Sequence, residues 1–223
     1  MNYQFQFDAV LAAWPLLLKG TWITLQLSLT ATLLGLVVAI FCAWGKTGGP
    51  GWLRFLISAY IEVIRNTPFI VQLFFFFFAL PSIGLRWSPY TAALTAMVVN
   101  LGAYAAEIVR AGIESIPKGQ IEAGKALNLK PWEIFRFVIL KPALKAIYPA
   151  LTSQFILLML SSAVVSVISA DDLTSVAANL QSQTFRSFEI YIVVAVIYLT
   201  LALSFSALFK LIYQRTLNYP DRR

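Results

Sequence analysis

Five apolar runs, each long enough to cross a bilayer as a helix, dominate this chain of 223 residues. A helix needs about 20 apolar residues to span the hydrocarbon core of a membrane. A backbone in lipid must also satisfy its polar groups internally. The expected spans lie roughly at residues 20–44, 52–80, 89–109, 147–170 and 188–213. The sequence therefore predicts an all-α fold, a polytopic membrane bundle of about five transmembrane helices.

The composition agrees with a lipid environment. Hydrophobic residues make up 59% of the chain and charged residues only 12%, against roughly 25% charged residues in soluble domains. The formal charge of +7 would suggest nucleic acid in a soluble protein. Here the basic residues flank apolar runs, so we interpret them as topology signals and expect membrane lipid, and no nucleic acid, as a partner.

The second apolar run is too long for one upright span. It contains the Phe74–Phe78 run and is interrupted by Arg65 and Pro68. Proline has no backbone N–H to donate, so we expect a kink at Pro68. The segment before it, residues 52–65, either lies along the membrane interface or crosses at a steep tilt.

Basic residues alternate between the connections in a way that predicts the topology. Two of the loops and the tail that would share one side carry 13 Lys and Arg, and the other side carries three, with Arg65 left unassigned. The larger group is Lys46, Arg54, Arg110, Lys118, Lys125, Lys130, Arg136, Lys141, Lys145, Lys210, Arg215, Arg222 and Arg223, and the smaller is Lys19, Arg86 and Arg186. The positive-inside rule then places the N-terminus outside and the C-terminus in the cytoplasm.

Residue types missing from the chain exclude several functions. Histidine is absent and Cys42 is the single cysteine, so we expect no metal site. No glycine-rich loop of the ATP-binding type is present. An integral membrane enzyme is disfavoured because no clustered acid pair is found either. We see no internal repeat or linker, and residues 1–223 are predicted to form one transmembrane domain.

The longest loop on the predicted cytoplasmic side, residues 110–146, has the pattern of a helix–turn–helix. One short helix is expected roughly from Lys118 to Leu127. Asn128 follows it, and asparagine tolerates the left-handed conformation that ends many helices. Pro131 would open a second helix and Pro142 would end it before the fourth span. From spacing alone, a docking surface for another protein and a plain solvated connection are equally compatible.

The sequence of this loop resembles a known motif. Residues 119–144 read GQIEAGKALNLKPWEIFRFVILKPAL, which is similar to the EAA loop in permeases of ATP-binding-cassette importers. Glu122, Ala123, Gly124, Ala126 and Leu127 match that pattern. Asn128 stands where the family usually has glycine, and Pro142 is shifted by one residue.

The resemblance extends over roughly residues 15–215 and points to the polar amino-acid permeases, the type I importers for histidine, arginine, glutamine and glutamate. Residues 65–73, with RNTP followed by VQL, look like an element of that subfamily. Residues 100–113, NLGAYAAEIVRAGI, and 183–191, QTFRSFEIY, do so as well.

This resemblance implies a division of labour in a bacterial inner-membrane importer. Two cytoplasmic ATPase subunits, which bind ATP and Mg, would dock on the EAA helices, and a periplasmic or surface binding protein would deliver the amino acid. This chain would bind no cofactor itself. The residues that the resemblance assigns to ATPase coupling are Gly119, Glu122, Ala123, Gly124, Ala126, Leu127 and Asn128.

Polar residues at membrane depth are candidates for the substrate pathway, because such groups are costly in lipid. Asn100, Tyr104 and Glu107 share one helical face by their spacing, and for the first two a pathway role and interhelical hydrogen bonding are equally compatible. For Glu107 a structural role, pairing with Arg110, is favoured. The pathway candidates are Thr67, Gln72, Asn100, Tyr104, Ser161 and Ser162.

The fourth span raises the question of a second permease. Many relatives place a charged residue near Ser161, where this chain has Leu160, Ser161, Ser162, Ala163 and Val164. A buried charged substrate needs polar partners, so we expect a related second permease to supply them in a heterodimer. A homodimer is the alternative. A stand-alone secondary transporter or channel for a small polar solute is the competing function, although no inverted repeat supports it.

Overall fold

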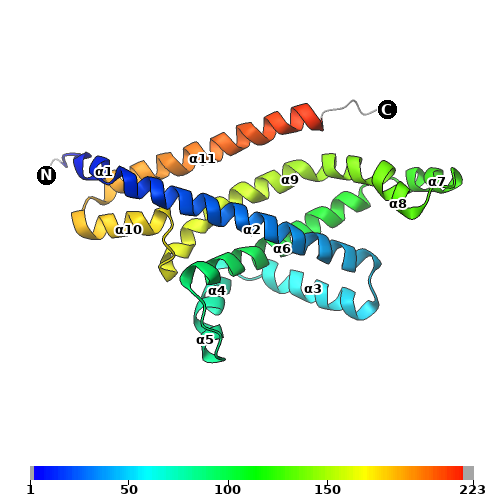
Figure 1. The fold of residues 1–223 in the computed structure, drawn as a ribbon, viewed down its shortest axis with the longest axis horizontal. Helices are drawn as coiled ribbons and strands as arrows, with labels where there is room; N and C mark the ends of the chain where they lie inside the picture. Colours follow the sequence, from blue (N-terminus) through cyan, green and yellow to red (C-terminus); the bar gives the residue numbers. More distant parts are fainter. Residues whose placement is uncertain (1–2, 218–223) are drawn as a thin grey trace.

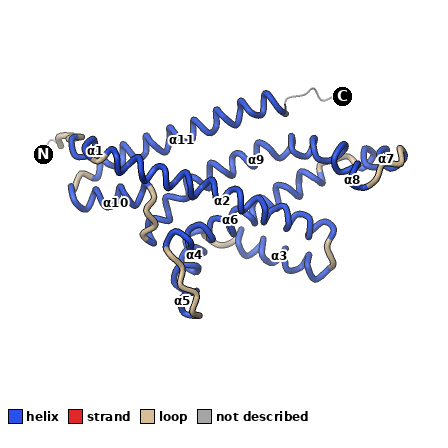
Figure 2. Tube along the Cα trace, viewed as in Figure 1, coloured by secondary structure: helices blue, strands red, loops and turns tan. Residues whose placement is uncertain are grey.

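The computed structural model describes residues 3–217, and within them every regular element is helical (Figure 2). The all-α prediction is confirmed. In chain order the elements are α1 Asp8–Ala12, α2 Trp14–Gly48, α3 Gly51–Arg65, α4 Phe69–Phe74, the π-helix η1 Phe75–Ala79, α5 Leu80–Ser82, α6 Pro89–Glu114, α7 Lys118–Ala126, α8 Pro131–Glu133, the π-helix η2 Ile134–Ile139, α9 Leu140–Ser161, the 3₁₀ helix η3 Ser162–Ile168, α10 Leu173–Thr184 and α11 Ser187–Thr216.

Four helical stretches of the described chain are long and apolar enough to cross a membrane, and a bent pair supplies a fifth span. The four are α2, α6, the continuous segment Pro131–Ile168 and α11. The bent pair joins Gly51–Arg65 to Phe69–Ser82 at 110°. The predicted kink at Pro68 is therefore confirmed, and the count of about five spans holds.

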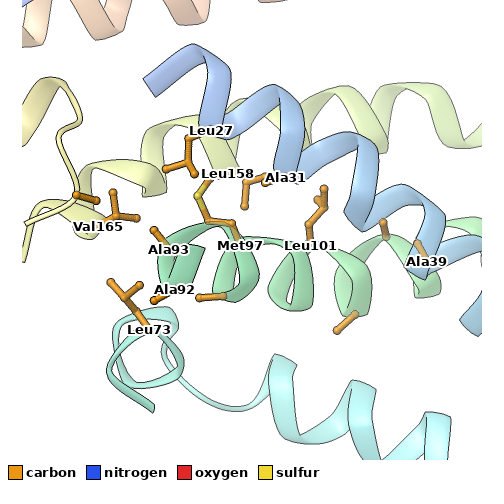
Figure 3. Packing of buried hydrophobic residues seen from close by; sticks show 14 of the residues in the cluster. Leu27, Ala31, Ala39, Leu73, Ala92, Ala93, Met97, Leu101, Leu158 and Val165 are labelled. Carbon is orange, nitrogen blue, oxygen red and sulfur yellow. The ribbon is translucent and has the colours of Figure 1, made fainter. Parts of the chain in front are cut away.

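Small side chains let α2 and α6 pack closely along the centre of the bundle. Ala31, Gly35 and Ala39 recur every fourth residue on the buried stripe of α2. A Cβ atom at Gly35 would lie 2.9 Å from the side chain of Leu101 on α6, so a larger residue there would displace Leu101. Figure 3 shows Met97 and Leu101 of α6 beneath α2, with Leu73 of α4 on the other side of α6. Helix association in lipid depends on such close packing, since lipid is as apolar as the side chains.

The outermost span is α11, which contacts α10 near its start and α9 farther along. Phe155 of α9 packs edge-on against Phe205 and Phe209 of α11, with ring centroids 4.9 and 5.3 Å apart. The Tyr148 hydroxyl donates a hydrogen bond of 2.9 Å to the Phe209 carbonyl. Most of the exposed side chains of α11 are apolar, as expected for a helix in contact with lipid.

The two ends of the bundle differ in what they carry. Figure 1 shows the α2–α3 turn, α7, α8 and the C-terminal end of α11 at one end, and α1, α10 and the start of α11 at the other. The first end holds the connections that contain the larger group of basic residues, and we call it the basic end. Arg222 and Arg223 of that group lie outside the described residues.

The fourth span is longer than predicted. Helical structure continues without a break from Pro131 through Pro142 and Pro149 to Ile168, so the prediction that Pro142 ends a helix is wrong. The π-helical turn η2 ends at Ile139, shortly before Pro142, and such a widened turn accommodates irregular hydrogen bonding around a proline. The part of the 110–146 loop outside the long helices is consequently short, from Ser115 to Lys130.

Candidate functional site

The first candidate site is a helix–turn–helix at the basic end, formed by α7, α8 and η2. Asn128 adopts the left-handed conformation with φ +58°. Its N–H donates to the Lys125 carbonyl at 2.9 Å, and the Leu129 N–H donates to the Gly124 carbonyl at 3.1 Å. These two bonds form a Schellman motif. Asn128 therefore adopts the left-handed conformation that a glycine usually supplies at this position, as the sequence predicts.

The second helix begins with its own cap. The Lys130 backbone N–H donates to a Glu133 side-chain oxygen at 2.7 Å, and Pro131 stands at the first helical position, where its missing N–H costs nothing. The rings of Trp132 and Phe135 stack with centroids 5.8 Å apart. Trp132 is 63% exposed. The turn is thus well defined and leaves an aromatic side chain on the surface.

The predicted coupling residues fall on two sides of α7. Gly124 is buried, and a Cβ there would lie 3.2 Å from Ile134 of η2, so this glycine allows the two helices to touch each other. The remaining residues of the set are exposed, and Leu127 reaches 75% exposure. The exposed ones are Gly119, Glu122, Ala123, Ala126, Leu127 and Asn128.

The second candidate site is the bend of the broken span, where polar side chains meet. The Gln72 amide nitrogen donates to the Ile64 carbonyl at 2.8 Å, the Thr67 carbonyl at 3.0 Å and the Thr67 hydroxyl at 2.9 Å. Its amide oxygen accepts from the Asn100 side chain at 3.0 Å. Gln72 is only 6% exposed. It thereby satisfies the carbonyls that the bend at Pro68 leaves without helical partners, and it ties α4 to α6.

A tyrosine of α3 and a tyrosine of α6 form further contacts between these two helices at the same bend. The Tyr60 hydroxyl donates to the Val99 carbonyl at 2.6 Å, and a Cβ at Gly102 would lie 2.8 Å from that hydroxyl. The Arg65 guanidinium lies 5.5 Å from the centre of the Tyr104 ring, and the Tyr104 hydroxyl donates to the Arg65 carbonyl at 3.4 Å. Four of the six pathway candidates, Thr67, Gln72, Asn100 and Tyr104, thus surround one bend. Tyr60 and Arg65 belong to it but were not among the candidates.

The two serine candidates lie elsewhere and do not act together. Ser161 ends α9 and is exposed. Ser162 begins η3, is fully buried and donates its hydroxyl to the Met159 carbonyl at 2.7 Å. Adjacent positions on a helix point in directions about 100° apart. Only Ser161 can therefore meet a solute without rearrangement.

A buried carboxylate lies toward the end of the bundle opposite the basic end. Asp172 is fully buried and caps α10 by accepting from the Ser175 N–H at 2.9 Å. The Tyr198 hydroxyl of α11 donates to its other oxygen at 3.4 Å. Beside it, the Leu173 N–H donates to the Thr24 hydroxyl of α2 at 3.1 Å. Burial raises the pKa of Asp172 to about 6. Helices α2, α10 and α11 thus meet at one titratable group.

Across residues 3–217, no group of three His, Cys, Asp or Glu side chains lies close enough together to hold a metal ion. The two candidate sites are the exposed surface of the helix–turn–helix and the polar bend inside the bundle.

Known proteins share both the sequence and the fold. The glutamine transport system permease protein of Escherichia coli K12 is 42% identical over 207 residues, which is 91% of this chain and 94% of that protein. The octopine transport system permease protein of Rhizobium meliloti is 33% identical over 216 residues, 93% of this chain and 87% of that protein.

Solved structures agree. A crystal structure of an amino acid ABC transporter with histidines matches with a TM-score of 0.89 and 38% identity, covering 96% of this chain and all of the other. A methionine ABC transporter in an inward-facing conformation shares the fold, with a TM-score of 0.71 at 22% identity.

A family model matches residues 31–218, and its description is binding-protein-dependent transport system inner membrane component. The match covers most of the chain, from the middle of α2 to the end of α11, and it includes the helix–turn–helix and the polar bend. The chain belongs to this family, the multi-pass permease subunits of binding-protein-dependent transport systems.

Proposed function

We propose that this chain is the permease of an ATP-driven importer for a polar amino acid, working by alternating access in the bacterial inner membrane. The relatives named for glutamine and octopine transport support the substrate class. The observation that carries the proposal is the exposed helix–turn–helix at the basic end, whose exposed alanines and Leu127 suit docking by another protein. A solute carrier that worked alone would not need such a surface.

In this proposal, ATPase subunits dock on the exposed face of α7. Glu122, Ala123, Ala126 and Leu127 form that face, with Gly119 before it and Asn128 after it. The small side chains of Ala123 and Ala126 let another backbone approach closely, and Leu127 offers an apolar contact. Gly124 serves from inside, by holding α7 against Ile134. The ATPase subunits, two in the full complex, bind ATP and Mg, and this chain binds neither and is not itself an enzyme.

The polar bend is the proposed part of the substrate pathway in this subunit. The Gln72 side-chain carbonyl and the Asn100 side-chain amide are hydrogen-bonded to each other. Thr67 and Tyr104 lie half-buried at the edge of the bend, where a solute can reach them. Ser161 is the candidate on α9. The fully buried Ser162 supports the helix and does not meet the solute in the conformation described.

The basic end faces the cytoplasm in this account. The N-terminus and α10 then lie on the periplasmic side, where a binding protein delivers the amino acid. This orientation rests on the distribution of basic residues between the two ends. It is supported by the grouping of the α2–α3 turn, α7, α8 and the end of α11 at one end of the bundle (Figure 1).

A second permease completes the pathway, and we favour a related chain over an identical one. Near the candidate Ser161, the exposed residues of the fourth span are Leu160 and Ser161, and neither is charged. A charged or zwitterionic substrate then depends on polar groups from the other half. Expressing this chain with only the ATPase and the binding protein separates the two assemblies. Transport that requires an added second permease supports the heterodimer, and full transport without it rules the heterodimer out.

The experiment that tests the proposed function measures ATP hydrolysis by the purified complex in liposomes. The binding protein is loaded in turn with each polar amino acid. One amino acid or a small set should stimulate hydrolysis. Equal hydrolysis with and without every amino acid, in a complex shown to be assembled, would argue against the function.

A further inference from the structure

Three charged side chains join α2 to α6 at the basic end. The Lys46 ammonium lies 2.6 Å from one oxygen of Glu107, and the Arg110 guanidinium lies 2.7 Å from the other. Arg110 also lies 2.5 Å from Glu114 of the same helix. The side chains of Lys46, Glu107 and Arg110 are 25%, 19% and 28% exposed. We refer to Lys46, Glu107 and Arg110 as the α2–α6 ion cluster.

Lys46, in the last turn of α2, reaches α6 through this cluster. Gly45, directly before Lys46, packs on Ile57 and Leu53 of α3. The end of α2 therefore forms a hairpin with α3, and Lys46 reaches from that hairpin to α6. At its other end, α3 is held to α6 by the Tyr60–Val99 hydrogen bond. Besides the apolar packing of α2 and α3 on α6, the α2–α3 hairpin is thus tied to α6 by two polar contacts, one of them ionic.

Helix α6 in turn leads directly into α7. It ends at Glu114, and α7 begins at Lys118, so three residues connect them. Three residues reach at most about 10 Å when extended. One of the three, Ile116, is only 7% exposed and is therefore packed in place. A displacement of α7 cannot be taken up by so short a connection and must move the end of α6.

We propose that Glu107 is a positioning residue for energy coupling, which makes the α2–α3 hairpin follow α6 when the ATPase displaces α7. This inference rests on the proposed function. Movement then passes from α7 to α6, through Glu107 to Lys46, and along α3 to the bend at Thr67 and Gln72. Without the carboxylate, α6 moves while the basic end of the hairpin lags behind.

The bundle itself does not need the cluster to fold. The α2–α6 interface is held along its length by the packing of Ala31, Gly35 and Ala39. Removing one member of a partly buried ion pair leaves its partner uncompensated, but here the partner retains some exposure to solvent. Assembly should survive, and the loss should fall on coupling.

The test compares uptake and hydrolysis in the complete reconstituted complex. Glu107→Gln keeps the shape of the side chain and removes its charge. The amount of amino acid imported per ATP hydrolysed should fall about fivefold, the size of effect that residues linking two sites commonly have. The rate of ATP hydrolysis and the thermal midpoint of the complex should stay close to those of the wild type.

Matched variants separate the cluster from general charge effects. Glu114→Gln removes an acid from the same helix that does not contact Lys46, and Arg54→Met removes an exposed base from the same end of the bundle. Both should keep normal coupling. Lys46→Met should reproduce the Glu107→Gln defect. The double variant Lys46→Met/Glu107→Gln should be no worse than either alone, because both remove one interaction.

The outcomes distinguish this inference from the function beneath it. If no amino acid stimulates ATP hydrolysis by the wild-type complex, the proposed function itself is contradicted. A wild-type complex that transports normally, with unchanged coupling in Glu107→Gln and Lys46→Met, would overturn only the inference. Failure of both variants to assemble would contradict it as well, because the bundle would then need the cluster to fold.

Discussion

Gln72 on α4 and Asn100 on α6 share a hydrogen bond of 3.0 Å that links the two halves of the polar bend to the central helix. The two residues are separated by 28 positions in sequence. The Gln72 amide N–H groups donate to the carbonyls of Ile64 and Thr67, and its side-chain carbonyl accepts from Asn100. A single side chain therefore sets the angle of the broken span and its position against α6.

Replacing either partner should show that they act as a pair. Gln72→Leu and Asn100→Leu should each destabilise the permease, and the two losses should not add, with an interaction energy of about 1 kcal/mol. Thermal or denaturant unfolding of the four proteins in detergent gives this value. A cycle of Asn100→Leu with Gln120→Leu, an exposed amide on α7, should be additive. Additivity in the Gln72 cycle would show that the bond contributes nothing.

A large side chain should weaken ATPase binding when placed on the proposed docking face of α7, but not when placed on the opposite side of the helix. Ala123→Trp places a large ring on the proposed docking face and should weaken ATPase binding at least about tenfold, equivalent to 1.4 kcal/mol. Lys125→Trp places the same ring on the opposite side of α7 and serves as the control. Co-purification and titration with the ATPase measure both. Equal binding by the two variants would mean that α7 does not dock in this orientation.

The buried Asp172 should make stability fall as the pH rises. Its pKa is raised from 3.8 to about 6 by burial. The folded protein therefore holds a proton that the unfolded chain has already lost between those values, and the stability contributed by this group is lost as the pH passes through about 6. Asp172→Asn keeps a capping side chain and removes the charge, so it should gain thermal stability relative to the wild type between pH 4.5 and pH 7.5.

Asp171→Asn provides the control for that titration. Asp171 is the exposed neighbour of Asp172, and its replacement should leave the pH dependence of the wild type unchanged. Thermal midpoints measured in steps across the same range decide the matter. A parallel pH profile for wild type and Asp172→Asn would show that the buried carboxylate does not titrate there.

Topology can be tested by labelling from one side of the membrane. In a Cys42→Ala background, a cysteine at Ser82 should react with an impermeant reagent added to intact cells, and a cysteine at Lys130 should not. Both positions are exposed on the surface of the chain, so access depends on the side of the membrane. Reaction at Lys130 and protection at Ser82 would reverse the orientation of the whole bundle.

Much of this fold could be predicted from local pattern. The apolar runs, the kink at Pro68 and the turn at Asn128 each depend on a few neighbouring residues and a known backbone preference. The extent of the fourth span could not be predicted in this way. Its helix continues through Pro142 because of the π-helical turn before it, and no residue type marks such a turn.

The candidate sites show the same division. The spacing of Asn100, Tyr104 and Glu107 correctly placed them on a face turned toward other helices. Their partners are Gln72 on α4, Arg65 on α3 and Lys46 on α2. Periodicity does not reveal how these three helices pack against α6. Gly124 is the clearest case: the resemblance assigned it to ATPase coupling, and the structure shows that it packs against Ile134 of the same motif.

The most direct test of the account is uptake of a labelled polar amino acid into liposomes that contain the permease, its ATPase and internal ATP, with the binding protein outside. A second permease is included if assembly requires it. We predict accumulation above the external concentration that stops when the ATP, the ATPase or the binding protein is left out. Equilibration of the amino acid by the permease alone, without ATP, would contradict the account and favour a stand-alone transporter or channel.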